Sequence, residues 1–387
     1  MLRWALLLVL LSTSALASRA DRLSVSPRLD RRDRLGATAA APDPILLSLS
    51  LLPPDSECSG TPPDGVTLTR SSAATCIDSS GVAHALATNE ARVHSTLGLL
   101  VEGSATNAVL HSRDVTAAPW IGTGCAKTGA GMDGFTSVGR CTGATSAIQI
   151  LTVATGARTA SAYVRRQSGT CNVQLKVDAE TTSKALLGGW ERLTLTYTSD
   201  GAVTLEVSVS SGCVVDIDYV QDEAGSIATS PIVTGGTAAV RAPDTAFADT
   251  SDASATEGCA AVDFAPLWSG PALDVSRTYL SFGNLNNRLG YTNLGSGAEL
   301  WSAYGGPGNG PVGATAAWVS GVPDRYRTEW SASAGELRVF AVSAATASFS
   351  SLWEPVSSMQ IGGQGGSVRA LGHLRNLVLG RTPEACQ

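Results

Sequence analysis

Alternation of apolar and polar residues is the main pattern along this chain. Three runs show it clearly, at 160–165, 192–197 and 203–209. Successive residues of a strand project to opposite faces, so each run predicts a strand with one face in a core and the other in water. Between residues 44 and 247, Gly, Pro and Asp interrupt short Thr-, Val- and Leu-rich runs, and no convincing amphipathic helix occurs. The pattern predicts an all-β chain of antiparallel β-sandwiches.

The N-terminus has a different pattern. Arg3 precedes an apolar run at 4–11, and small residues follow at 15–17, which is typical of a secretory signal peptide cleaved after Ala17. Residues 18–43 are rich in Arg, Asp and Ala, and we expect a disordered leader there. The apolar run is too short to span a membrane, and no other segment has the required length. We expect a secreted or extracellular protein, with the periplasm as an alternative.

Composition narrows the set of partners. A formal net charge of -6 and the absence of a basic stripe argue against nucleic acid. Eight cysteines in an exported chain favour disulfides. The sequence contains no CxxC pair of the kind that would indicate a metal site. Other connectivities stay open, but sequential pairing keeps each bridge inside one predicted domain and would join Cys58 to Cys76, Cys125 to Cys141, Cys171 to Cys213 and Cys259 to Cys386.

Residues 98–110 read GLLVEGSATNAVL and follow a strand-pair pattern at 65–78. Together these runs resemble a pattern of phage tail and spike-fibre proteins. The runs GWERL at 189–193, GSIATSPI at 225–232 and VRAPD at 240–244 are similar to the corresponding parts of the jelly-roll carbohydrate-binding modules found in such proteins. The resemblance implies a jelly-roll module over residues 44–247.

A second strand-rich block follows a predicted linker at 248–258 and runs over 259–387. Its runs at 325–330, 336–342, 359–363 and 371–379 resemble, in order, the late strands of laminin-G or concanavalin A-like sandwiches. The fold class is then two jelly-roll-type sandwiches in tandem. The two resemblances imply a secreted, non-catalytic protein that binds a polysaccharide or cell-surface glycan, or that acts in adhesion.

Aromatic residues are scarce, at 5% of the chain, and most tryptophans fall in the second block. Sugar rings stack on aromatic faces with help from polar hydrogen bonders, so exposed aromatics on a sandwich are candidate glycan contacts. Packing in the core is the alternative for each of them. The candidate glycan-binding residues are Arg288, Tyr291, Asn293, Trp301 and Tyr304.

One acidic strand is a second candidate site. We expect Asp216, Asp218 and Asp222 to share one face of an extended strand, where carboxylates could bind calcium, the one cofactor left open. A glycosidase of concanavalin-like fold uses a comparable strand for catalysis. Here the run matches the last strand of the binding-module pattern instead, and GxSxG and HExxH are both missing. We therefore expect no enzyme.

Three readings stay open. The leading one is glycan binding or adhesion, the second is a structural tail-like or appendage component, and the third is a glycoside hydrolase or lyase acting through residues 216–223. Assembly into a homo-oligomer is also open. Neither the identity of the glycan nor a bacterial or phage origin follows from the residues.

Overall fold

The structure is a computed structural model. It describes residues 45–53, 56–252, 257–267, 277–282, 287–293, 299–305, 312–315, 319–331, 333–334, 336–341, 344–348, 358–362 and 372–387. The predicted signal peptide and leader lie outside these residues. Within them the protein is all-β with several antiparallel sheets, and the 3-10 turn η1 (Pro383–Cys386) is the helical element that the described residues contain.

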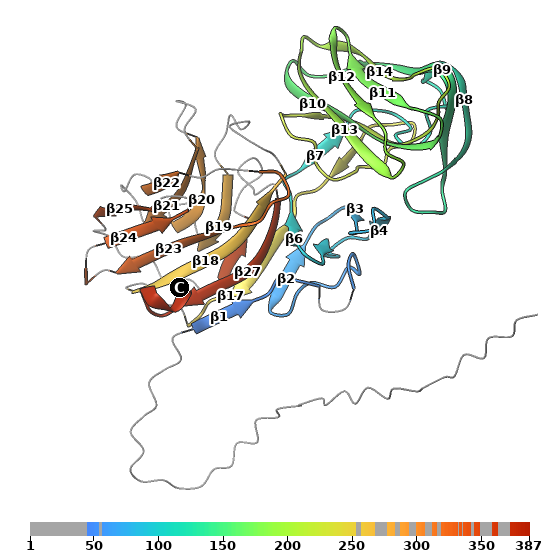
Figure 1. The fold of residues 1–387 in the computed structure, drawn as a ribbon. Coiled ribbons are helices and arrows are strands. Elements are labelled where there is room, and N and C mark those ends of the chain that lie inside the picture. Colours follow the sequence, from blue (N-terminus) through green and yellow to red (C-terminus); the bar gives the residue numbers. More distant parts are fainter. Residues whose placement is uncertain are drawn as a thin grey trace, which may run out of the picture. The chain divides into compact units, whose positions relative to one another are not determined.

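An eight-stranded antiparallel sheet contains most of the C-terminal strands (Figure 1). Its order is β25 (Ala344–Ser348), β24 (Glu336–Phe340), β23 (Asp324–Ser331), β18 (Glu257–Pro266), β27 (Gly372–Gly380), β6 (Gly98–Val101) and β5 (Val93–His94), and β1 (Ile45–Leu49) also pairs with β27.

A seven-stranded sheet packs against it. Its order is β2 (Val66–Thr69), β17 (Thr245–Asp249), β26 (Ser358–Ile361), β19 (Arg277–Phe282), β20 (Asn287–Asn293), β21 (Glu299–Gly305) and β22 (Val312–Thr315). One hydrophobic core unites the two sheets, because it contains Val262 and Phe264 of β18 together with Leu280 of β19 and Ile361 of β26. These side chains are fully buried. The core is a face-to-face contact between sheets, as period-two patterning requires.

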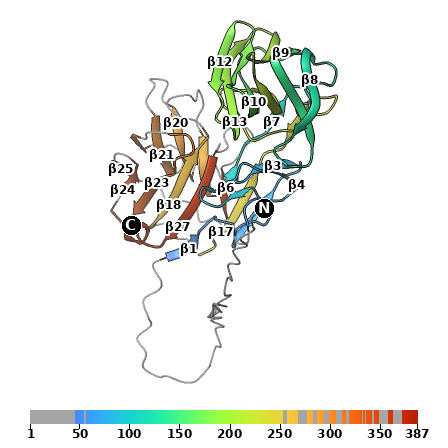
Figure 2. The same cartoon turned by 45° about the vertical axis from the view of Figure 1, so that its right-hand side comes forward.

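Segments from both ends of the sequence build this pair of sheets. β1 pairs with β27 over residues 45–49, and β6 pairs with the same strand. Figure 2 labels all three strands in this sheet. In the other sheet, β2 pairs with β17. The predicted domain limits stay predictions, but strand pairing crosses the predicted linker at 248–258. β17 and β18 also occupy part of that linker.

Residues between these two contributions form a third sheet with its own core. Its order is β12 (Glu180–Ala185), β11 (Asn172–Val177), β14 (Ala202–Val209), β9 (Ser137–Thr152), β15 (Val214–Ala224), β10 (Gly156–Ser168) and β13 (Trp190–Ser199), with β8 (Ile121–Ala130) paired to β9. The edge strands β12 and β13 contact each other, so the sheet is nearly closed. Two small ribbons join β7 (Ala105–Asn107) to β16 (Ala239–Arg241), and β3 (Ala74–Ile77) to β4 (Ala83–Leu86).

The alternating pattern predicts the positions of the strands well, but it predicts less well which of their side chains are exposed. β14 follows it, since Val203, Leu205 and Val207 are buried between more exposed polar residues. In β10 the predicted exposure of the polar face is wrong at Ser161, which is fully buried, whereas Tyr163 and Arg165 on the same face are partly exposed. The Ser161 hydroxyl accepts a hydrogen bond of 2.9 Å from Arg192 of β13. A satisfied polar side chain can thus be buried on the second face of β10 at this position.

All eight cysteines form disulfides, and the pairing is sequential. The bridges are Cys58–Cys76, Cys125–Cys141, Cys171–Cys213 and Cys259–Cys386. Four disulfides indicate folding in an oxidising compartment. No helix in the described part of the chain is long and apolar enough to cross a membrane.

We expect the bridge with the longest loop to stabilise the fold most. A disulfide lowers the entropy of the unfolded chain, and the effect grows with the enclosed loop. Cys259–Cys386 encloses 127 residues and Cys125–Cys141 encloses 16. Replacing both cysteines by Ala should lower the free energy of unfolding by about 5 kcal/mol for the first pair and about 3 kcal/mol for the second. Urea denaturation measures both, and a larger loss for the second pair would contradict the entropic ranking.

Candidate functional site

A bulge in β15 redistributes the predicted acidic residues. Between Asp218 and Gln221, β15 advances by three residues while β10 advances by two. Tyr219 lies inside this bulge with a φ of 47°. Asp222 therefore faces the side opposite to Asp216 and Asp218. The expectation that the three aspartates share a face is wrong, because strict alternation assumes a strand without a bulge.

Asp216 and Asp218 are fully buried, and arginines neutralise both. Asp216 accepts hydrogen bonds from Arg140 Nε at 2.7 Å and from Arg165 Nη2 at 2.9 Å. Asp218 receives two parallel bonds of 2.8 Å from Arg113. Such bidentate pairs are among the stronger charge-assisted hydrogen bonds. These carboxylates hold β15 against its neighbours.

Asp222 lies on the core-facing side of β15 and is also fully buried. It accepts hydrogen bonds from Arg158 and, at 2.5 Å, from the Tyr197 hydroxyl. Burial raises the pKa of Asp222 above its usual range. The next residue, Glu223, is buried on the other side, where it accepts a bond of 2.9 Å from the Thr229 backbone N–H, and burial raises its pKa too.

These contacts do not support a calcium site on β15. Each aspartate has its own arginine, and the described residues contain no group of three or more His, Cys, Asp and Glu side chains placed to hold a metal ion. Catalysis at 216–223 meets the same obstacle, because two carboxyl groups must flank the bond of a bound sugar. Asp216, Asp218 and Asp222 are 0% exposed. A substrate cannot reach them without local unfolding.

A second set of buried charges lies where the chain leaves and re-enters the two-sheet core. Asp244, directly before β17, accepts hydrogen bonds from Arg70 at 2.9 Å and from Arg92. Glu102, directly after β6, pairs with Arg92 and lies 3.0 Å from Arg241. All five side chains are at most 1% exposed. We call these residues the junction network.

Backbone groups and one serine complete the junction network. The Glu102 N–H donates to the Asp244 carboxylate and the Asp244 N–H donates to the Glu102 carbonyl, each at 2.9 Å. Ser230 donates to Glu102 from its N–H at 2.8 Å and its hydroxyl at 2.6 Å. Burial opposes the charge of Glu102, but Arg241, Arg92 and these donors hold its pKa well below the usual range.

The sequence did not predict this network, although Arg70, Glu102, Ser230, Arg241 and Asp244 stand in the runs at 65–78, 98–110, 225–232 and 240–244. Arg92 lies outside these runs. Glu102 is the one charged residue within 98–110, and Arg241 and Asp244 stand in 240–244. A lone charge inside an otherwise apolar or small-residue run was the available signal. Its partner could not be chosen from the sequence, because 142 positions separate Glu102 from Asp244.

Replacing Glu102 by Gln should strongly destabilise the fold, because it leaves Asp244 as the one carboxylate of the junction network beside three buried arginines, and it removes the ion pair of Arg241 with Glu102. We expect a loss of about 3–5 kcal/mol in the free energy of unfolding. The matched control is Glu206→Gln, because the Glu206 carboxylate forms a partly exposed ion pair of 3.7 Å with Lys176. This variant should lose less than about 1 kcal/mol in the free energy of unfolding. Equal losses in urea denaturation would show that the junction network is energetically ordinary.

His373 of β27 lies beside the same network. Its Nδ1 lies 3.2 Å from the Gly98 carbonyl oxygen, and its ring meets that of His94 edge-on at 5.8 Å. With Arg92, Glu102 and Ser230 it lines a cavity of about 140 Å³. Burial lowers the pKa of His373 from 6.5 to about 4, and the nearby His94 acts in the same direction. The folded protein thus keeps this imidazole neutral.

The lowered pKa predicts a loss of stability in mild acid. Between pH 6.5 and about 4, the unfolded chain binds a proton at His373 that the folded chain does not, so the free energy of unfolding falls as pH falls. The contribution is at most about 3 kcal/mol, and less because the ring is partly solvated. His373→Gln should flatten the pH dependence of urea unfolding in this window. An unchanged slope in the variant would remove His373 as the cause.

The predicted glycan platform falls on β20 and β21, whose backbone register the structure describes. Tyr291 is directly opposite Trp301, and Arg288 is directly opposite Tyr304. Asn293 ends β20 opposite Glu299. The five predicted positions thus fall on two adjacent strands, although they lie up to 16 residues apart in the sequence. They do not share one face, because alternation puts positions 291, 293 and 301 on one side of the sheet and positions 288 and 304 on the other.

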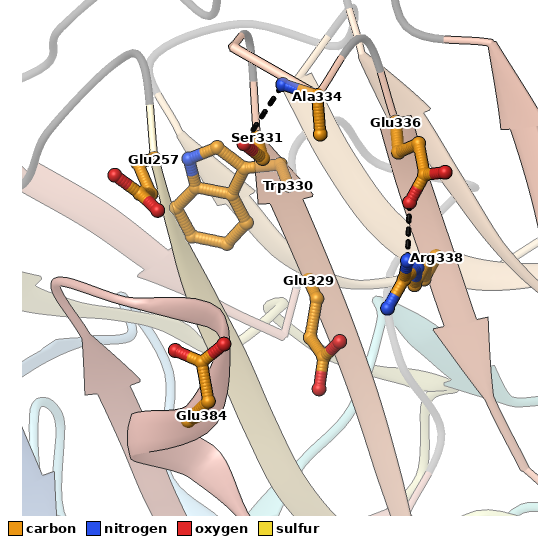
Figure 3. Close-up of a pocket in the computed structure, with 8 residues that line it drawn as sticks. All are labelled: Glu257, Glu329, Trp330, Ser331, Ala334, Glu336, Arg338 and Glu384. Carbon is orange, nitrogen blue, oxygen red and sulfur yellow. Dashed lines mark hydrogen bonds and ion pairs between the residues drawn. The ribbon is translucent and has the colours of Figure 1, made fainter.

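A pocket of about 190 Å³ lies in the other sheet of the same pair (Figure 3). It was not predicted. Four glutamates contribute to its wall, from the start of β18, from β23, from β24 and from η1. The lining residues are Glu257, Glu329, Trp330, Ser331, Ala334, Glu336, Arg338 and Glu384.

Comparison with known proteins gives distant structural similarity and no family. No family model matches the sequence, and no curated protein matches it. The full extracellular region of zebrafish Gpr126/Adgrg6 is similar at 11% identity and a TM-score of 0.22, over 71% of this chain and 37% of that one. Tail fiber protein gp63.1 from an E. coli phage is similar at 8% identity and a TM-score of 0.20, over 72% of this chain and 40% of that one. The chain thus spans about two fifths of the length of either protein.

Proposed function

We propose that the protein is an extracellular, non-catalytic glycan-binding protein. In this proposal it is built of jelly-roll and laminin-G-like sandwiches and contacts a polysaccharide or cell-surface glycan through β20 and β21. The observation that carries it is the register of these strands, in which Tyr291 lies opposite Trp301 and Arg288 opposite Tyr304. Tyr291 and Trp301 occupy opposed positions, and Asn293 follows two residues later on the same face of β20, an arrangement that suits the stacking and hydrogen bonding of a sugar ring. The positions of Arg288 and Tyr304 alternate to the other face, so they are not part of this platform.

Two further observations support the proposal. Four disulfides fit a protein that works in an oxidising, extracellular setting. The acidic residues that would serve a glycosidase on β15 are buried and paired with arginines, so they suit scaffolding better than acid–base chemistry. Binding without turnover is the simpler use of such a molecule.

Tyr291→Ala and Trp301→Ala should each reduce binding to glycan-array ligands by tenfold or more, because each removes one stacking surface. The array, followed by calorimetry on the best ligand, measures the loss. The matched control is Phe135→Ala, since Phe135 is 97% exposed on the turn between β8 and β9, in a different sheet. It should bind as the wild type does.

Three outcomes would contradict the proposal. Equal losses in the Phe135 variant and the β20–β21 variants would show that the platform is not specific. A blank array together with a defined oligomer in light scattering would favour a structural assembly component. Release of reducing sugar that Asp218→Asn abolishes, in a variant that stays folded, would instead restore the glycosidase reading.

A further inference from the structure

The pocket of Figure 3 has more negative than positive charge around it. Glu336 pairs with Arg338, and Glu329 lies 3.1 Å from Arg327 Nε. Glu257 and Glu384, on the rim, make no ion pair within the part of the chain that the structure describes, and both are exposed. A pocket with this balance attracts a cation and repels an anion.

Glu329 supplies a second and independent observation. Its side chain is 5% exposed, and it stands on the pocket wall between Glu384 and Arg338. Its Oε1 is buried without a hydrogen-bond partner, and so is Arg327 Nε, which means that their 3.1 Å approach is badly aligned. Burial raises the pKa of Glu329, against the effect of Arg327, Arg338 and a hydrogen bond from Gln387 to this carboxylate. A buried carboxylate oxygen without a donor is costly, and a ligand N–H would satisfy it.

The shape of the pocket limits the ligand. Its volume of about 190 Å³ is below the roughly 300–1,000 Å³ of sites for drug-sized molecules. An oligosaccharide therefore does not fit inside, whereas one long side chain does. The wall also contains Ala334, which is exposed and against which an aliphatic stem can pack, and an edge of Trp330, which is only 2% exposed.

We infer that this pocket receives an arginine side chain of a protein partner, in which the guanidinium donates to Glu329 and lies between the carboxylates of Glu257 and Glu384. Arginine fits better than lysine because its planar fork presents several N–H groups in fixed directions to carboxylate oxygens. The inference does not depend on glycan binding, since the pocket and the β20–β21 platform belong to different sheets.

The test titrates the full-length protein with a capped Gly-Arg-Gly peptide and follows binding by NMR. The control peptide has citrulline in place of arginine, which keeps the shape and removes the charge. We expect saturable binding of the arginine peptide, at least tenfold weaker binding of the citrulline peptide, and weakening with added salt. Lysine in the same peptide should bind several-fold more weakly than arginine.

Variants locate the site. Glu384→Gln and Glu257→Gln, which change exposed residues, should each weaken arginine binding about threefold or more without unfolding the protein. Glu329→Gln should weaken it at least tenfold, and its fold is checked by circular dichroism. Glu206→Gln, on β14, is the matched control and should bind normally.

Three results would overturn the inference. One is equal binding of the arginine and citrulline peptides, and another is unchanged binding in Glu384→Gln and Glu257→Gln. The third is a response to calcium chloride or to glucosamine with none to the arginine peptide, which would assign the pocket to another cation. None of these results bears on Tyr291 or Trp301, so failure here is distinguishable from failure of the glycan proposal.

Discussion

The junction network is the interaction on which the rest of the structure depends. It joins Glu102, where the chain leaves the two-sheet core, to Asp244, where the chain returns to it. Between these residues the chain forms the whole third sheet. Buried carboxylates and guanidiniums are expensive to desolvate unless each finds a partner, and here Arg70, Arg92 and Arg241 supply those partners.

An apolar cluster of the same size could be equally stable. The charges favour one arrangement of the chain over others, because an arrangement in which these two segments did not meet would bury arginines without carboxylate partners. The reciprocal backbone bonds between Glu102 and Asp244 fix the register of the crossing at the level of single residues. We interpret the network as the device that lets two distant segments share one core. It is consistent with the places of β6 and β17, which lie one strand in from an edge in two different sheets.

The sequence predicted the local features of this fold and missed the long-range ones. Alternation identified β13 and β14 because side-chain periodicity is a property of one strand. It placed Asp222 on the wrong face because a bulge at Tyr219 leaves no signal in the apolar pattern. The pairing of β1 with β27 could not be foreseen, since no residue of a strand specifies a partner some 330 positions away. Of the candidate site, the sequence selected the residues of β20 and β21 but not their register.

Long-range strand pairing also determines which acidic residues are neutralised in the folded chain. In the sequence, acidic residues are dense in the run at 216–223, whereas the glutamates at 257, 329, 336 and 384 are scattered. The density of the run is what made it a candidate metal or catalytic site. In the structure the dense run is neutralised, because β9 and β10 bring Arg140, Arg158 and Arg165 to it. The scattered set gathers at one pocket with fewer arginines than glutamates. Unbalanced charge, and not density of charge, is what a ligand can recognise. In a folded chain, the neighbouring strands determine whether each carboxylate meets an arginine. The excess of negative charge therefore arises at glutamates that lie far apart in the sequence, and not in the dense run at 216–223.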